Sequence, residues 1–374
     1  MHRSARCSMQ SRQAAPADGH AANADYGERH TGMKKIETFT DVLGEDALIA
    51  RLRSRAKEGA VPHAVLFVGE EGSGKKTLAA LYSKLLLCEQ GGEEPCLVCA
   101  SCKQVAQGAH PDVYQIAPEE GKGGSLKPIP VALIRRELID NIQIKPYKGP
   151  YKIYIVDHAE KLTIEAQNAL LKTLEEPPSY AVIILLATAE DHLLETVRSR
   201  CVTMRMEPVE EEKVREYLRE ECTAPDYRAR PAARFAQGNV GKAGELVSSD
   251  LFADCCDGVL QIFERAEHTG YDEIVRRAQE MKDDAKTCDL YLELIQILLR
   301  DVLAVKAFDG ESELFFEDKR EQIEALAGSL SYPAIAQIQK QIYISKERME
   351  QNVAVDMVVE GLLSLIKEKM TWQK

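Results

Sequence analysis

The sequence contains no apolar run of the eighteen or so residues that a membrane span requires. The N-terminus carries arginines but no apolar segment of the kind found in secretion signals. Basic residues are not in excess either, because 48 Lys and Arg stand against 60 Asp and Glu, a net charge of -12. Nucleic-acid binding by a chain acting alone needs a concentrated basic surface, so this balance argues against it. We therefore expect a cytoplasmic protein with no membrane partner.

One local basic face remains open, formed by Lys145, Lys148 and Lys152, although a solvated loop before a strand explains these residues better. Residues 1–32 show no periodicity and are expected to be disordered, or to be an over-extended reading frame ahead of Met33. Ten cysteines without a secretion signal favour a reducing compartment and, where clustered, metal binding rather than disulfides. A length of 374 residues suggests two or three domains.

The first half of the chain alternates between strand and helix patterns. Strands buried on both faces of a parallel sheet read as continuous apolar runs, which predicts an α/β fold. The predicted strands are Ala64–Val68, Ile153–Val156 and Val182–Ala187, with Val113–Ile116 and Val202–Met206 as weaker candidates. The predicted helices between them are Lys76–Leu87, Ile134–Ile142 and Ile164–Glu176.

After Pro208 the strand signals largely vanish and the period becomes helical. One apolar stripe runs from Leu290 to Val302 and another from Val355 to Ile366. We expect an α/β domain over residues 33–207, a small helical lid over 208–249 and a helical domain over 250–374. No segment repeats at a fixed period.

The segment Gly69–Thr77 matches the phosphate-binding pattern G-x-x-x-x-G-K-[ST] except at its last position. In an intact loop the glycines expose backbone amides to phosphate, the lysine reaches the outer phosphates, and the hydroxyl binds Mg²⁺. Here Gly69, Gly72, Gly74 and Lys75 are in place, but Lys76 puts an ammonium where the metal needs an oxygen. Thr77 cannot substitute, because one helical residue turns the side chain by about 100°. We expect a nucleotide site that is weak or vestigial, with ATP and Mg²⁺ binding in doubt.

The strand Ile153–Val156 ends in Asp157, where an ATPase of this kind keeps its Mg²⁺-binding carboxylate. A glutamate that activates water normally follows, but His158 stands there, and Glu160 is expected to point elsewhere. The plainer alternative is that Asp157 only caps a turn.

Cys88, Cys96, Cys99 and Cys102 form the pattern C-x₇-C-x₂-C-x₂-C. Four thiolates at such short spacing suit a closed, structural Zn²⁺ site. Unliganded cysteines and an iron–sulfur cluster are weaker alternatives.

Two further motifs lie near the predicted domain edge. Arg200, within Ser199-Arg200-Cys201, has the exposure and chemistry to reach a neighbour's γ-phosphate, although a surface salt bridge is the more common role of such a residue. The segment from Gly238 to Lys242 resembles a lid motif whose fourth residue is normally an arginine that contacts nucleotide, and Gly241 holds that place.

Taken in chain order, these features resemble a bacterial replicative clamp loader of the AAA+ class. The resemblance runs from about Phe39 to Leu246 and includes the opening Phe39–Gly44, the inserted cysteine module, the signature Asn168–Pro178 and the Ser-Arg-Cys motif. The sequence Gly74-Lys75-Lys76-Thr77 is similar to delta-prime subunits rather than to the motor subunits gamma and tau, which have an intact loop.

The resemblance implies a RecA-like α/β domain with a zinc module, a lid, and a C-terminal collar that oligomerises. It also implies a hetero-pentamer with gamma/tau and delta subunits that loads the sliding clamp on primed DNA. Arg200 would act as an arginine finger in trans within a DNA polymerase III assembly, while the chain itself has no independent catalysis. Two alternatives remain: an active gamma/tau-like ATPase that tolerates Lys76, and a zinc module that binds DNA through residues 89–107.

Overall fold

The computed structural model describes residues 36–121, 125–280, 285–308, 313–351 and 353–371. The prediction of disorder for residues 1–32 lies outside these ranges. Within them, no helix is both long enough and apolar enough to cross a bilayer.

A five-stranded parallel sheet with the order β2-β3-β4-β1-β5 forms the centre of the N-terminal half. All five predicted strands are present, and the central ones are buried on both faces because helices cover the sheet on each side. The strands are β1 (Ala64–Val68), β2 (Val113–Ile116), β3 (Lys152–Val156), β4 (Ala181–Ala187) and β5 (Val202–Arg205). The α/β fold class predicted from the sequence is therefore confirmed.

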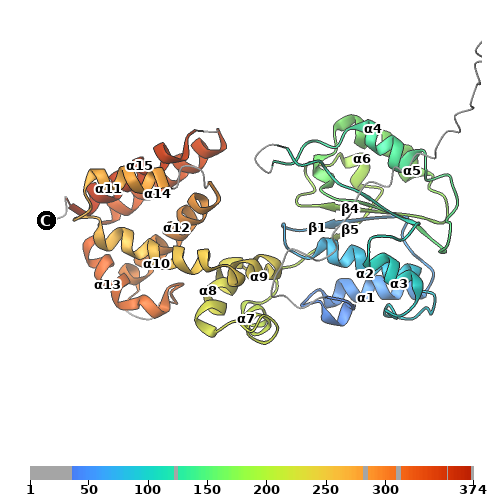
Figure 1. Ribbon diagram of the computed structural model, residues 1–374, viewed down its shortest axis with the longest axis horizontal. Coiled ribbons are helices and arrows are strands. Elements are labelled where there is room, and N and C mark those ends of the chain that lie inside the picture. The colour runs from blue at the N-terminus through green and yellow to red at the C-terminus, as the bar shows by residue number, and fades with distance from the viewer. Residues whose placement is uncertain (1–35, 122–124, 281–284, 309–312, 352, 372–374) are drawn as a thin grey trace, which may run out of the picture.

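Helices pack on the two faces of the sheet as two separate layers (Figure 1). Odd and even positions of each strand point to opposite layers, so Val65 and Phe67 face one core while Ala64 and Leu66 face the other. The first layer consists of α1 (Asp46–Lys57), α2 (Lys75–Leu87) and α3 (Ala100–Ala106). The second consists of α4 (Val131–Ile134), the π-helical turn η3 (Arg135–Ile139), α5 (Ile164–Glu175) and α6 (Glu195–Arg198).

The second half of the described chain is helical (Figure 1). Three helices follow the sheet directly: α7 (Glu211–Glu220), α8 (Asp226–Ala236) and α9 (Val240–Ser248). The remaining helices are α10 (Asp250–Arg265), α11 (Tyr271–Glu280), α12 (Ala285–Ala307), α13 (Arg320–Ser329), α14 (Tyr332–Glu350) and α15 (Val355–Thr371). One hydrophobic cluster joins all of this half, from Val214 in α7 to Met370 in α15. The predicted stripe on α12 is part of it, with Leu294, Leu298 and Val302 fully buried.

Candidate functional site

The loop after β1 has the shape of a phosphate-binding loop. Gly72 (φ 84°) and Gly74 (φ 91°) both adopt the left-handed conformation, which glycine reaches at no steric cost. Gly74 is also the N-cap of α2, so the first amides of that helix face the loop. Thr77 lies partly buried in the first turn of α2. The glycine positions predicted from the motif therefore do hold the loop backbone.

Lys75 folds back onto the loop itself. Its Nζ donates to the carbonyl oxygens of Gly69 at 2.6 Å and Glu70 at 2.7 Å, and the residue is 9% exposed. Burial lowers the pKa of this ammonium, while the nearby carboxylates of Glu160 and Asp157 oppose that shift. In this conformation the lysine neutralises carbonyl dipoles of its own chain.

Lys76 forms an ion pair with Asp157. The two atoms, Nζ and Oδ2, are 2.6 Å apart, and Asp157 follows directly after β3. The Lys76 side chain is 66% exposed and the Asp157 side chain only 14%, so a largely exposed ammonium pairs with a largely buried carboxylate. In a working site of this kind, the hydroxyl at position 76 and this carboxylate would both serve a divalent cation. Here an ammonium occupies the position beside Asp157.

His158 and Glu160 form a second polar pair beside Asp157. His158 Nδ1 lies 3.2 Å from Glu160 Oε1, and Glu160 Oε2 accepts from the Thr188 backbone N–H at 3.3 Å. Burial disfavours the charge on Glu160, but the hydrogen bonds from His158 and Thr188 outweigh it and bring its pKa to about 2. The bond to Glu160 raises the pKa of His158. The Glu160 carboxylate is thus bonded to His158 and to the Thr188 backbone, and its charge raises the pKa of Lys75.

The N-terminus of α9 packs directly on the phosphate-type loop. The Asn239 side chain donates to the Glu71 carbonyl at 2.7 Å, and the Gly241 N–H donates to the Gly72 carbonyl at 3.2 Å. Lys242 does not face the loop with its charge, because its Nζ lies 4.7 Å from the centre of the Phe235 ring. The segment from Gly238 to Lys242 thus hydrogen-bonds to the loop backbone. Lys242, which follows the position where an arginine was expected, packs its ammonium on the Phe235 ring instead.

The four clustered cysteines converge between α2 and α3. Their Sγ atoms all lie within 4.8 Å of one another, and Cys96 and Cys102 are 4.0 Å apart. A tetrahedral ion with metal–sulfur bonds of about 2.3 Å separates its ligands by about 3.8 Å, so the arrangement fits such an ion. Backbone N–H groups of Cys96, Cys99 and Cys102 donate to the sulfurs of Cys88, Cys96 and Cys99, respectively, and so help to hold the four side chains together. The cluster is able to hold a metal ion.

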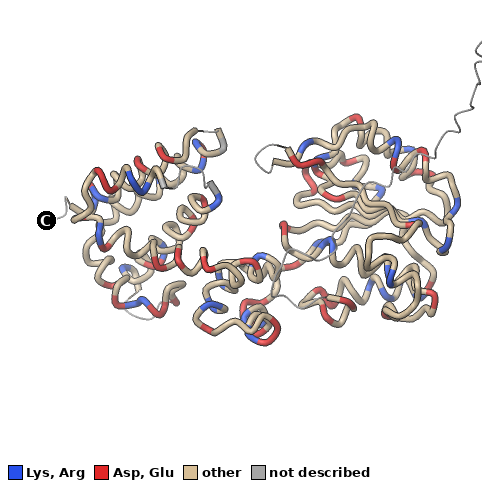
Figure 2. The backbone as a smooth tube through the Cα atoms, viewed as in Figure 1, with Lys and Arg blue, Asp and Glu red and all other residues tan. Residues whose placement is uncertain are grey.

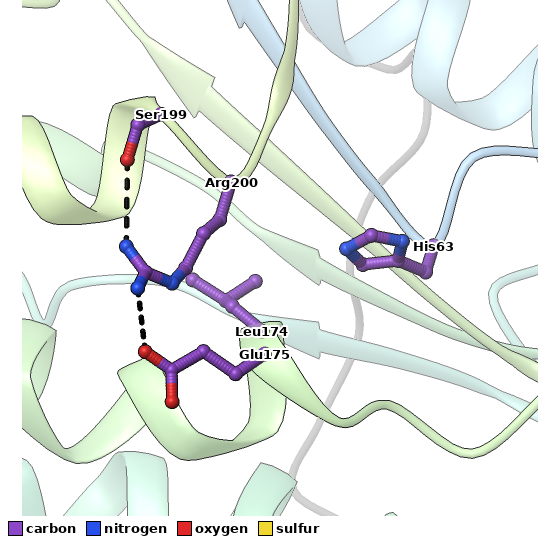
Figure 3. Close-up of a pocket in the computed structure, with 5 residues that line it drawn as sticks. All are labelled: His63, Leu174, Glu175, Ser199 and Arg200. Atoms are coloured by element: carbon purple, nitrogen blue, oxygen red, sulfur yellow. Dashed lines mark hydrogen bonds and ion pairs between the residues drawn. The ribbon is translucent and has the colours of Figure 1, made fainter.

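Arg200 lies at the other end of the sheet, in the turn between α6 and β5. Its Nη2 is 2.6 Å from Glu175 Oε1 at the end of α5 (Figure 3). Its Nη1 donates to the Thr196 carbonyl at 2.8 Å. The two side chains line an open depression together with His63, Leu174 and Ser199. Since the strands are parallel, Arg200 and His63 lie at their amino ends, whereas the loop and Asp157 lie at their carboxyl ends.

Comparisons with known proteins agree with this geometry. Residues 44–210 match the family model described as DNA polymerase III, delta subunit. A protein of Bacillus subtilis (strain 168) named DNA polymerase III subunit delta' is 29% identical over 309 residues, which is 82% of this chain and 91% of that protein. The chain belongs to the clamp-loader family of DNA polymerase III subunits. Its α/β part has the parallel sheet that the sequence predicted.

This clamp-loader subunit is also similar to tau and gamma subunits of DNA polymerase III. The tau/gamma subunit of Haemophilus influenzae is 31% identical over 308 residues, covering 75% of this chain and 44% of that protein. The tau subunit of Escherichia coli is 35% identical over 222 residues, covering 58% and 33%. The chain thus spans most of its delta' relative but less than half of these two tau relatives.

Two polar residues of this clamp-loader subunit were missed from the sequence. Thr188 follows β4 and donates its backbone N–H to Glu160, and Glu175 pairs with Arg200. A polar residue just after a buried strand was a usable signal for Thr188. No local pattern singled out Glu175 from Glu176, because only the fold brings α5 against the turn at Arg200.

Proposed function

We propose that this clamp-loader subunit is of the delta-prime type and does not hydrolyse ATP itself. The observation that carries the proposal is the ion pair between Lys76 and Asp157. A divalent cation would have to displace the ammonium and would find no hydroxyl at position 76. Lys75 is turned onto loop carbonyls, and His158 stands in place of the water-activating glutamate, which both support the same conclusion.

The proposed contribution of this subunit is Arg200. In the assembled loader, Arg200 acts as an arginine finger that stabilises charge on the γ-phosphate held by a neighbouring gamma/tau subunit. Its partly exposed position, at the end of the sheet away from its own loop, supports action on a neighbour rather than on itself. ATP turnover in the hetero-pentamer with gamma/tau and delta subunits then drives loading of the sliding clamp on primed DNA.

Two structural parts complete the proposal. The ion held by Cys88, Cys96, Cys99 and Cys102 is zinc with a structural role, since four sulfur ligands leave no position open for chemistry. Residues 250–374 form the collar that joins the subunits. Figure 2 shows acidic and basic residues interspersed along both halves of the chain, which gives no support to DNA binding by the isolated subunit.

The test is ATP turnover by a reconstituted loader that contains either the wild-type subunit or Arg200→Ala. We expect the variant to lower turnover at the neighbouring site by at least about tenfold. This is less than the rate enhancement that arginine fingers supply in other phosphoryl-transfer enzymes. Arg205→Ala is the matched control, because Arg205 makes an ion pair of the same 2.6 Å length with Glu190 at the opposite end of β5. Full activity of the Arg200→Ala loader would contradict the finger assignment.

A gamma/tau-like motor is the second candidate, favoured by the 35% identity to a tau subunit. That function predicts ATP hydrolysis by the purified chain and its loss in Lys75→Ala. Our proposal predicts negligible turnover by the purified chain with either residue at position 75.

A further inference from the structure

The guanidinium of Arg200 is fixed along one edge by its own chain. Nη1 donates to the Thr196 carbonyl at 2.8 Å. Nη1 also approaches the Ser199 hydroxyl at 3.4 Å, while Nη2 donates to Glu175 at 2.6 Å (Figure 3). Thr196 and Ser199 lie within four residues of Arg200, at the end of α6, whereas Glu175 comes from α5. Glu175 therefore determines the direction of the outer half of the side chain.

The planar guanidinium has a second edge, formed by Nε and one N–H of Nη2. Among the described residues, nothing hydrogen-bonds to Nε of Arg200, and Glu175 is the single partner of Nη2, which carries two N–H groups. Arginine uses Nε and Nη2 together for bidentate recognition of two phosphate oxygens. A phosphate could therefore bind Nε while Glu175 stays bonded to Nη2.

Glu175 is well placed to act as a fixed support. It is the last residue of α5, next to Leu174, which is 1% exposed and anchors the end of the helix. The carboxylate itself is 49% exposed, so holding it beside the arginine carries no large burial cost.

We infer that Glu175 is a positioning residue for Arg200, and this inference rests on the proposed function. Its carboxylate holds the guanidinium so that the Nε–Nη2 edge faces the phosphate of the neighbouring subunit. The opposite role, in which Glu175 withholds the arginine until the neighbour displaces it, would require the acceptor to occupy the edge that phosphate uses. Among the described residues, no acceptor occupies Nε, the donor at the inner end of that edge.

The experiment measures kcat and KM for ATP in the reconstituted loader with Glu175→Ala. We expect kcat to fall about tenfold, since small errors in the placement of a catalytic group are costly. KM for ATP and the yield of assembled complex should stay within about twofold, because Glu175 does not contact the nucleotide. Glu175→Gln keeps an oxygen acceptor and should lose less than Ala. Glu176→Ala removes the adjacent, exposed glutamate and is the matched control.

The double variant Glu175→Ala, Arg200→Ala decides whether the two residues act together. A positioning residue has nothing to position once the arginine is gone, so the double variant should be no slower than Arg200→Ala alone. Additive losses, an unchanged kcat, or a higher kcat in Glu175→Ala would each overturn the inference. If Arg200→Ala itself has no effect, the proposed function fails; if only Arg200→Ala has an effect, the positioning role alone fails.

Discussion

Lys76 places its own ammonium beside the carboxylate of Asp157, where a nucleotide site of this kind would hold Mg²⁺. Its ammonium lies 2.6 Å from Asp157, so the carboxylate that would otherwise face Mg²⁺ is already neutralised. Most of the Lys76 side chain is exposed, which limits the stability gained from the pair. The main effect of the ion pair is therefore to keep a divalent cation from Asp157, and its contribution to the stability of the fold is small.

Replacing Lys76 with Thr should restore Mg²⁺-dependent nucleotide binding. The change frees Asp157 and supplies the missing hydroxyl, so affinity for ATP with Mg²⁺ should rise at least about tenfold over wild type, or roughly 1.4 kcal/mol. Titration calorimetry with the purified chain measures this, and hydrolysis should remain negligible because His158 is unchanged. Lys76→Ala removes the ammonium without adding an oxygen, and equal binding by the two variants would contradict the account.

Single residues also mark where sequence reasoning ended. The glycines, Lys75 and Lys76 were identified because the motif fixes their spacing along the chain, and Asp157 because it directly follows a predicted buried strand. The bond between Glu160 and the Thr188 N–H could not be predicted, because His158 adopts a left-handed conformation (φ 48°) between Asp157 and Glu160. Backbone reversals by a non-glycine residue leave little trace in sequence.

Among the elements, strands were predicted better than one of the helices. Apolar β-rich runs such as Val182–Ala187 located the buried strands to within a residue or so. The segment 134–142 was expected to be one helix, but α4 ends at Ile134 and continues as the π-helical turn Arg135–Ile139. Periodicity alone does not separate the two forms, because both place apolar residues about one turn apart and packing decides between them.

The cysteine module offers a test at the scale of one element. Removing the metal with a chelator should lower the melting temperature, because ligand binding to the folded state contributes directly to folding. Cys102→Ser should abolish stoichiometric metal content measured by mass spectrometry, since Cys102 is one of the four clustered thiols and is only 2% exposed. Cys222→Ser, outside the cluster, is the control and should retain the metal. An unchanged melting temperature after chelation would refute a structural role.

Across the whole molecule, the lid helix α9 connects the helical half to the loop of the AAA+ domain. A Cβ on Gly241 would lie 2.3 Å from the Gly72 carbonyl oxygen, so no side chain fits there without moving backbone. The predicted boundaries at residues 208 and 250 remain predictions, but the contact at Gly241 shows where the halves touch. The shared hydrophobic cluster from α7 to α15 further indicates that lid and collar helices pack as one body.

Gly241→Ala should loosen this connection. We expect a loss of about 1–3 kcal/mol in unfolding free energy from the forced displacement, together with faster hydrogen exchange in the loop from Gly69 to Gly74. Gly328→Ala is the control, because a Cβ there meets nothing within 4 Å, and alanine favours a helix by up to about 1 kcal/mol. Equal stability of the two variants would mean that the loop and lid are not held together by this close approach.

The placement of the loop and Arg200 at opposite ends of the sheet has a genetic consequence. If the proposed function holds, an allele that damages the loop from Gly69 to Gly74 should be nearly silent as long as the protein folds. An allele that removes Arg200 should instead mimic a defect in the gene of the neighbouring motor subunit, although that gene is intact. A screen for replication mutants would then find one cluster of lesions in this gene that behaves as if it belonged to another.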